Sequence, residues 1–495
     1  MKKILLLLLS VLVICCQKKD DSIKNDLGLK TYSKEQLTED FDLLTNSLKE
    51  AHTGLYWYST EQQFDSIVKA QRNKITDSLN SLEFYNITAP LVAFAKEDHC
   101  DIYLDETAKK ALLKNGKFLP LSVITLQDKV YVLNNPAPDI DIKGYQLLAI
   151  NNKPIKDIYT SIYNTFAADG FVKSSKYRYL DGRKFAIEYA KTIARPDTFE
   201  ITVLNPETNK EKTYEITAVD IITLVRINKA LYKEGVFKSV EVPAKLDITD
   251  NSTAVLTINT FSNDDYEEEG MNFKTFIENS FSRLKTLNIK NLIIDLRENG
   301  GGTEGNEDYI FSYLTNKPYN KYKYVQASAF SYSFYKYSDY DAEDIEELET
   351  DLKKEHYLAD DGRILRKADV NIPTAIQPDP FTGNVYLLTS GWTYSGGAEF
   401  CSLMKEHTNA VFVGEETGGG FLGNTSGYSI ELTLPNTGIA VDLPLLKFVL
   451  DVSENKVPYG RGVIPDHKIQ PTINEFLKGY DTPLEYTKKL IAKSN

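Results

Sequence analysis

The chain has few cysteines and no long apolar run after its N-terminus. Four of its 495 residues are cysteine, and two of these, Cys15 and Cys16, are adjacent. The remaining pair, Cys100 and Cys401, is too small a set for a disulfide framework or a zinc site. Beyond Ile14 no run approaches the roughly eighteen apolar residues of a membrane-spanning helix. The sequence therefore predicts a soluble body, tethered by its N-terminus and without a metal centre.

Basic residues are also fewer than acidic residues. The chain has 57 Lys and Arg against 70 Asp and Glu, a formal net charge of −13. Since nucleic-acid binding depends on basic side chains at phosphates, this balance argues against a nucleic-acid partner. The length exceeds what one domain usually holds, so we expect two or three domains.

Residues 1–16 have the pattern of an export signal. Two lysines precede the apolar runs Ile4–Leu9 and Val11–Ile14, which are too short to span a bilayer as a helix of about 20 residues. The segment resembles a bacterial lipoprotein signal, and the following QKKDD resembles the charged tract of Bacteroidetes-type surface lipoproteins. This resemblance implies a lipid on Cys16, or on Cys15, and a place in the cell envelope, on the periplasmic or surface-exposed face of the outer membrane. A plain signal peptide is the alternative.

Changes in hydrophobic periodicity divide the rest of the chain. Residues 17–30 are polar and predict a tether, and 31–112 show apolar spacings of three and four that predict a helical N-terminal domain. Residues 113–220 predict short strands with a helical insert, and 221–495 alternate strands and helices as in an α/β core. Within that core, 319–380 is Tyr-rich and then acidic, which predicts an insertion or lid.

The β-rich region contains KGYQLLAINNKPI, residues 143–155. This stretch is similar to the strand and turn of PDZ domains inserted in processing proteases, which bind an extended peptide by adding it as a strand. Any small β-rich module is the alternative. A Gly-Leu-Gly-Phe type carboxylate loop is not visible, so the resemblance does not extend to binding of a chain terminus.

The stretch VYLLTSGWTYSGGAEFCSLM, residues 385–404, places a serine at a strand-to-helix turn. The apolar run Val385–Leu388 predicts a buried strand, and the residues after Gly396 have helical spacing. Ser395 would then lie beside the free N–H groups of the first helical turn, where an oxyanion is stabilised. The stretch is not the G-x-S-x-G elbow, and the alternative is a serine that caps an ordinary helix.

Three separated stretches resemble the C-terminal processing (tail-specific) serine peptidase family. They are LIIDLRENGGG at 292–302, LTSGWTYSGGAEF at 388–400, and the closing segments VGEETGGG with NTSGY at 413–428 and GRGVIPD at 460–466. The resemblance covers about 254–469. It implies an α/β core like the crotonase/ClpP spiral of ββα units, serine endopeptidase activity on polypeptides, and no cofactor or metal.

The family has two kinds of base. One branch uses a lysine after the serine, but no lysine occurs between Lys405 and Lys447. The other branch, similar to the tricorn core and to retinoid-binding-protein-like modules, takes a histidine from the end of the helical domain. KEDHCDIYL, residues 96–104, supplies His99 in that position, and His52 in HTGLY is the alternative. The other three histidines are expected to be structural: His356, His407 and His467.

The oxyanion donors also follow from the resemblance. It assigns one N–H to the glycine loop after DLR, at Gly300 or Gly301, and another to Gly396. Glycine suits such a position because substrate approaches the backbone closely and φ is free to be positive. The alternative for the loop is a tight turn. Asp295 and Arg297 predict a structural ion pair.

A Ser/His pair also needs an acid that orients the base. The tricorn-type tetrad uses a second serine and a distant glutamate, for which Glu454 and Glu415 are candidates; exposed loop carboxylates are the alternative. Family members often carry Glu three residues after the serine, where this chain has Ala398 followed by Glu399.

Together these patterns predict a serine peptidase that forms an acyl-enzyme: Ser395 attacks the peptide carbonyl and His99 moves the proton. The alternative is a non-catalytic ligand-, glycan- or peptide-binding lipoprotein on the same fold, which Ala398 and the Tyr-rich stretch favour. If His99 approaches Ser395, a disulfide between Cys100 and Cys401 is a further hypothesis.

Overall fold

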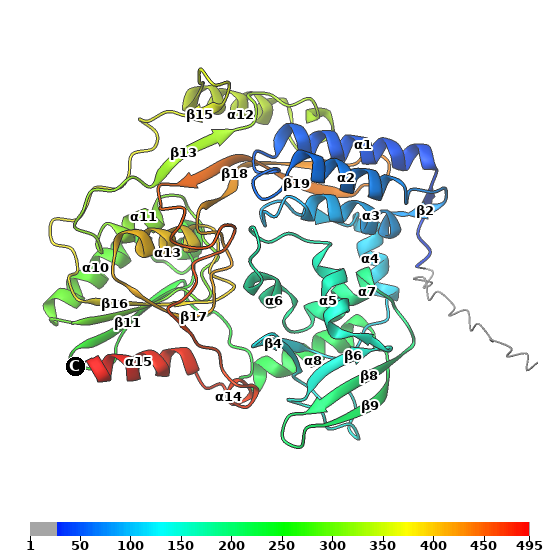
Figure 1. Cartoon of the computed structure of the whole chain (residues 1–495), viewed down its shortest axis with the longest axis horizontal. Coiled ribbons are helices and arrows are strands. Elements are labelled where there is room, and N and C mark those ends of the chain that lie inside the picture. Colours follow the sequence, from blue (N-terminus) through cyan, green and yellow to red (C-terminus); the bar gives the residue numbers. More distant parts are fainter. Residues whose placement is uncertain (1–26, 495) are drawn as a thin grey trace, which may run out of the picture.

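The computed structural model describes residues 27–494 (Figure 1). The lipoprotein signal predicted at 1–16 and most of the tether predicted at 17–30 lie outside the described residues. None of the helices in the described part is long and apolar enough to cross a membrane.

The N-terminal region is helical. It comprises α1 (Lys34–Ala51), α2 (Glu61–Arg72), α3 (Ser81–Ala93) and α4 (Glu106–Asn115), with the short strands β1 (Thr31–Tyr32), β2 (Leu79–Asn80) and β3 (Ile102–Tyr103). Capping boxes at Ser33, Thr60 and Asn80 start the first three helices, because each cap side chain and the residue three places later satisfy each other's backbone N–H. These caps fix where the helices begin.

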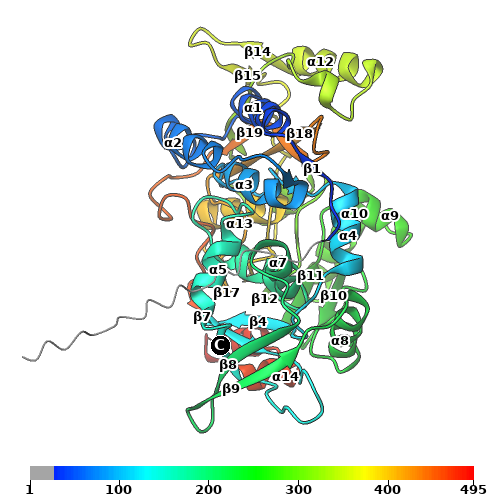
Figure 2. The same ribbon diagram turned by 90° about the vertical axis from the view of Figure 1, so that its right-hand side faces the viewer.

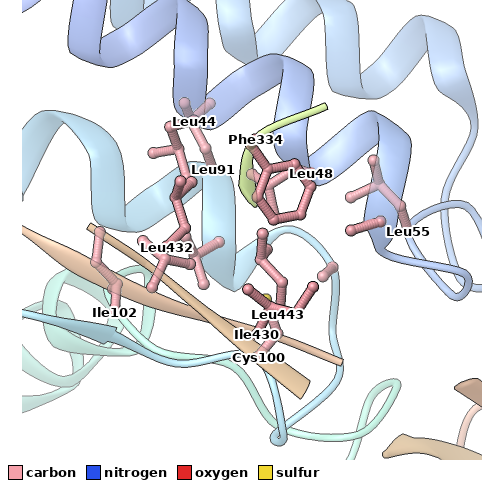
Figure 3. Close-up of a cluster of buried hydrophobic side chains, with 14 of the residues drawn as sticks. Leu44, Leu48, Leu55, Leu91, Cys100, Ile102, Phe334, Ile430, Leu432 and Leu443 are labelled. Carbon is pink, nitrogen blue, oxygen red and sulfur yellow. The ribbon is translucent and has the colours of Figure 1, made fainter. Parts of the chain in front are cut away.

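An antiparallel sheet lies beneath these helices. Its strand order is β14 (His356–Leu358), β15 (Ile364–Arg366), β13 (Tyr322–Ala327), β19 (Ala440–Leu450) and β18 (Gly423–Thr433), and β3 also pairs with β19. Leu44 and Leu48 of α1 pack with Leu432 and Leu443 of the sheet in one buried core (Figure 3). The N-terminal helices therefore share a core with strands that follow them by more than 300 residues in the sequence.

The stretch 319–380 divides into two parts. Strand β13 lies inside the sheet, and Phe334, next to the 3₁₀ turn η1 (Tyr335–Tyr337), is only 1% exposed in the shared core. The helix α12 (Ala342–Glu355) with β14 and β15 projects from the body (Figure 2). Only this second part has the form of an insertion.

The β-rich region forms a second antiparallel sheet. Its strands are β4 (Val123–Leu126), β5 (Lys129–Val132), β6 (Gln146–Ile150), β8 (Thr198–Asn205) and β9 (Lys210–Thr217), with β7 (Lys153–Pro154) paired to β6. The helices α5 (Ile155–Tyr163), α6 (Ser174–Leu180) and α7 (Lys184–Thr192) lie between β7 and β8 in the sequence, and α8 (Ile221–Lys233) follows β9. Asn151 and Asn152 have φ of 49° and 61°, as the tight β6–β7 hairpin requires. The PDZ-like assignment stays a prediction.

The third sheet carries the motifs of the serine segment. Its order is β10 (Ala244–Ile248), β11 (Thr253–Ile258), β12 (Asn291–Asp295), β16 (Asn384–Thr389), β17 (Val411–Gly414) and β20 (His467–Lys468), parallel except for β10. The remaining helices are α9 (Asn263–Glu268), α10 (Phe273–Thr286), α11 (Asn306–Phe311), α13 (Gly396–His407), α14 (Ile473–Leu477) and α15 (Thr482–Ser494).

Helices cover both faces of this parallel sheet, with α10, α11 and α13 on one side and α15 on the other (Figure 1). Alternate strand residues such as Leu292 and Leu387 join the core with α10, α11 and α13, whereas Ile293 and Leu388 join the core with α15. The predicted α/β core is confirmed. Because the carboxyl ends of parallel strands share one edge, the loops after β12 and β16 meet there.

Candidate active site

Ser395 is held in a strained turn at the start of α13. Its φ of 47° and ψ of −126° are a conformation that costs a residue with a side chain roughly 1–3 kcal/mol. Its side chain makes no capping hydrogen bond, so Ser395 is not an ordinary cap. The hydroxyl is therefore free for another role, and the residue as a whole is half-buried.

His99 meets this serine from another part of the molecule. It lies in the loop between α3 and β3, and its Nε2 is 3.3 Å from Ser395 Oγ although the two residues are 296 apart in the sequence. Burial lowers the pKa of the imidazole, and the nearby carboxylates of Asp169 and Glu399 act in the opposite direction. A neutral imidazole at this distance is able to take the serine proton.

The alternative base, His52, occupies a different environment. It is buried at the end of α1, its Nδ1 accepts a hydrogen bond from the Gly54 N–H at 3.1 Å, and burial lowers its pKa to about 4. Within residues 27–494 no hydrogen bond joins it to Ser395. The geometry therefore favours His99 over His52. The other three histidines also lie elsewhere: His356 begins β14, His407 ends α13, and His467 pairs with Tyr486.

The glycine loop after β12 packs against the nucleophile. Gly301 has φ of 98°, and a Cβ at this position would lie 2.7 Å from Ser395 Cβ and 3.0 Å from its Oγ. Only glycine allows this approach. The Gly301 N–H donates to Asn299 Oδ1 at 2.9 Å, whereas the described residues offer no acceptor for the N–H of Gly300 or Gly396. These two N–H groups are thus the ones left open for an oxyanion.

A second glycine segment, in the VGEETGGG motif, closes the other side of the turn. A Cβ at Gly419 would lie 3.2 Å from the Ser395 nitrogen and 2.5 Å from the Ala398 Cβ. The small side chain at 398 is therefore matched to this close packing. The neighbouring Glu399 is buried and pairs with Lys321 at 3.1 Å and with Asn424 at 2.9 Å.

The structure does not bring the two glutamates proposed from sequence to His99. Glu454 is exposed, pairs with Lys323 at 3.0 Å, and lines a pocket of about 200 Å³ with Trp57 and Tyr459. Glu415 accepts from the Gly391 N–H at 3.2 Å. Neither carboxylate forms a hydrogen bond or ion pair with His99 or Ser395 in the described chain.

Another acid, Asp169, lies beside the pair and was missed from sequence. It is 1% exposed, its Oδ1 accepts from the Tyr394 hydroxyl at 2.6 Å and the Asp98 N–H at 3.1 Å, and its Oδ2 accepts from the Gly420 N–H at 2.9 Å. Burial raises its pKa, and the nearby His99 acts to lower it. Its only sequence signal is an Asp-Gly turn, which many surface loops share.

Two further side-chain predictions are settled by contacts. Arg297 donates to Asp295 at 2.6 and 2.9 Å and also pairs with Asp481, so the predicted structural ion pair is confirmed. Cys100 and Cys401 are free and lie in different buried cores, so the hypothesis of a disulfide between them is wrong. Among the described residues, no group of three or more His, Cys, Asp or Glu is placed to hold a metal.

Comparison with known proteins finds a matching family model and solved structures with a similar fold. Residues 252–469 match the model of Peptidase family S41. A search of the curated proteins found no match. The crystal structure of mature CPAF is 16% identical, covers 93% of this chain and 97% of its own, and has a TM-score of 0.61. The structure of mature CPAF complexed with lactacystin is 15% identical, covers 93% and 98%, and also has a TM-score of 0.61.

At this level of identity the likeness shows a shared fold along nearly the whole chain. The family match contains Ser395 and both glycine segments, whereas His99 and Asp169 lie before it. The chain therefore carries a Peptidase family S41 domain, and the loops that complete its candidate site come from the regions that precede this domain.

Proposed function

We propose that this protein is a serine peptidase that cleaves polypeptides through an acyl-enzyme intermediate in the cell envelope. One observation carries the proposal: His99 Nε2 lies 3.3 Å from the hydroxyl of Ser395, which is held in a strained turn at a helix start. This is the nucleophile and base geometry of acyl transfer.

In this proposal, each step of the reaction is assigned to a residue. His99 takes the Ser395 proton as the oxygen attacks the peptide carbonyl, and the developing oxyanion is stabilised by the N–H groups of Gly300 and Gly396. One such donor is worth about 2.7–4 kcal/mol in other enzymes. His99 then gives its proton to the leaving amine, and water, deprotonated by the same imidazole, hydrolyses the ester.

The envelope location rests on the sequence of residues 1–16. We propose a lipid on Cys16, or on Cys15, that anchors the protein to the membrane. Cells that express the full chain with Cys16→Ser, Cys15→Ser or both, fed an alkyne fatty acid, test this. We expect the fatty acid on the wild type and its loss in one single variant; an unlabelled wild type would favour the plain signal peptide.

A serine-directed fluorophosphonate tests the catalytic proposal. We expect mass spectrometry to find the adduct on Ser395 in the wild type and none in His99→Ala, with labelling retained in His52→Ala, which separates the two candidate bases. Circular dichroism checks that each variant is folded. A folded wild-type protein that is not labelled would instead favour the non-catalytic ligand-, glycan- or peptide-binding alternative.

A further inference from the structure

Three segments of the site meet at one carboxylate. Asp169 accepts from the backbone N–H of Asp98, which precedes His99, and from the side chain of Tyr394, which precedes Ser395. Its other oxygen accepts from the Gly420 N–H, next to the glycine that packs on the Ser395 nitrogen. The three donors to Asp169 are therefore the direct sequence neighbours of the base His99, the nucleophile Ser395 and the packing glycine Gly419.

We propose that Asp169 is the positioning residue of this site: it fixes the three segments relative to one another and balances the charge of His99 when the imidazole holds the proton. The inference rests on the proposed peptidase function. In a Ser/His pair an orienting acid usually performs this task. Here Asp169, which precedes the family domain, would perform it.

No other residue is seen to orient His99 through a hydrogen bond to its second ring nitrogen in the described chain. Its Nδ1 is buried and has no hydrogen-bond partner in residues 27–494, so no acid holds the ring directly. The two carboxylates that act on its charge are Asp169 and Glu399. Glu399 is already paired with Lys321, whereas no Lys or Arg of the described chain forms an ion pair with Asp169. Asp169 is therefore the unbalanced negative charge beside the base.

Neighbouring acids do not replace it. The titratable or charged groups that face Asp169 and His99 lie just before His99, between α1 and α2, just before Ser395, and in α13. They are Glu97, Asp98, Tyr58, Tyr394 and Glu399. Behind them, Lys447 acts on Glu97 and Lys176 on Asp98. Burial raises the pKa of Glu97 and of Asp98 well above the usual range, with the Asp169 charge as the second cause. The three donors on Asp169 make it the carboxylate best able to stay ionised.

Asp169→Asn tests the proposal because it keeps the shape and removes the charge. We expect kcat to fall by about 10- to 100-fold, the size of effect that misplaced catalytic groups produce, with KM changed less than about threefold. Without the anion, protonated His99 is less stable, so its pKa falls and the acid limb of kcat/KM moves to lower pH. Asp169→Glu keeps the charge, and its acid limb is expected to stay near that of the wild type.

Asp40→Asn is the matched control. Asp40 is fully buried, like Asp169, and accepts from the N–H groups of Asn436 and Thr437 and from the Thr437 hydroxyl, which ties α1 to the β18–β19 turn. Its loss is expected to lower Tm without moving the acid limb. If Asp169→Asn likewise lowers Tm or kcat but leaves the acid limb in place, Asp169 is merely structural and the proposal is overturned.

An NMR titration of the His99 imidazole separates this proposal from the proposed function. We expect Asp169→Asn to lower the His99 pKa whether or not a peptide substrate is found. A wild type that is neither labelled nor active, with this fall still present, would contradict the peptidase and leave the charge role standing. An unchanged His99 pKa in Asp169→Asn, with an active wild type, would overturn the charge role alone.

Discussion

Ser395 and its glycine segments come from the Peptidase family S41 domain, whereas His99 and Asp169 come from loops that precede it. The first half is built locally: β16, a turn and α13 follow one another, and the Gly301 loop lies at the adjacent end of β12. The second half depends on the packing of the helical region and the β-rich region onto that domain. The nucleophile is therefore encoded by contiguous motifs, whereas its activation depends on contacts between distant segments.

Removing the nucleophile is expected to have the largest effect. Ser395→Ala leaves no oxygen to form the acyl-enzyme, and comparable changes in serine proteases lower kcat by about 10⁴- to 10⁶-fold. Peptide turnover by the purified variant measures this loss. Activity within tenfold of the wild type would show that another residue attacks the substrate.

Gly301→Ala tests whether the close approach of the glycine loop to Ser395 is needed for activity. The added methyl group would lie 2.7 Å from Ser395 Cβ at a position with φ of 98°, so we expect kcat to fall by about 100-fold. Gly362→Ala is the control, because Gly362 has φ of 83° but a Cβ there meets nothing within 4 Å. If both variants lose the same activity, the cause is backbone strain and not the approach to Ser395.

The stability of the N-terminal helical region is expected to depend on pH through His52, which ends α1. Since burial lowers its folded pKa to about 4 from 6.5, the stability due to neutral His52 is present above pH 6.5 and is lost as pH falls toward 4. Between pH 7 and pH 5 this loss is worth about 2 kcal/mol. Urea unfolding at both values is expected to show this loss in the wild type and a smaller one in His52→Gln. Equal losses in the two proteins would show that His52 does not cause the loss of stability.

The smallest effect is expected at Glu454. Its pair with Lys323 is exposed to solvent, where ion pairs contribute little, so Glu454→Gln should change kcat less than about twofold. Steady-state kinetics on a peptide substrate measures this. A loss of tenfold or more would return Glu454 to the role of the distant glutamate that the sequence resemblance suggests.

The surroundings of Ser395 could be predicted from the sequence in detail. The strand, the glycine loop and the turn at Ser395 are visible because hydrophobic periodicity and glycine spacing report structure within a few residues. His99 could be predicted only through a resemblance, since no local pattern says which of five histidines meets a serine 296 residues away. The contacts of Tyr394 and Gly420 with Asp169 depend on how regions pack, so the sequence gives no sign of them.

Chemical rescue of His99→Ala tests most directly whether His99 activates Ser395. We expect this variant not to label Ser395 with a fluorophosphonate, and added imidazole to restore part of the labelling rate by supplying the missing base. Labelling of Ser395 in His99→Ala at the wild-type rate without imidazole would contradict the central claim that this distant histidine activates the serine.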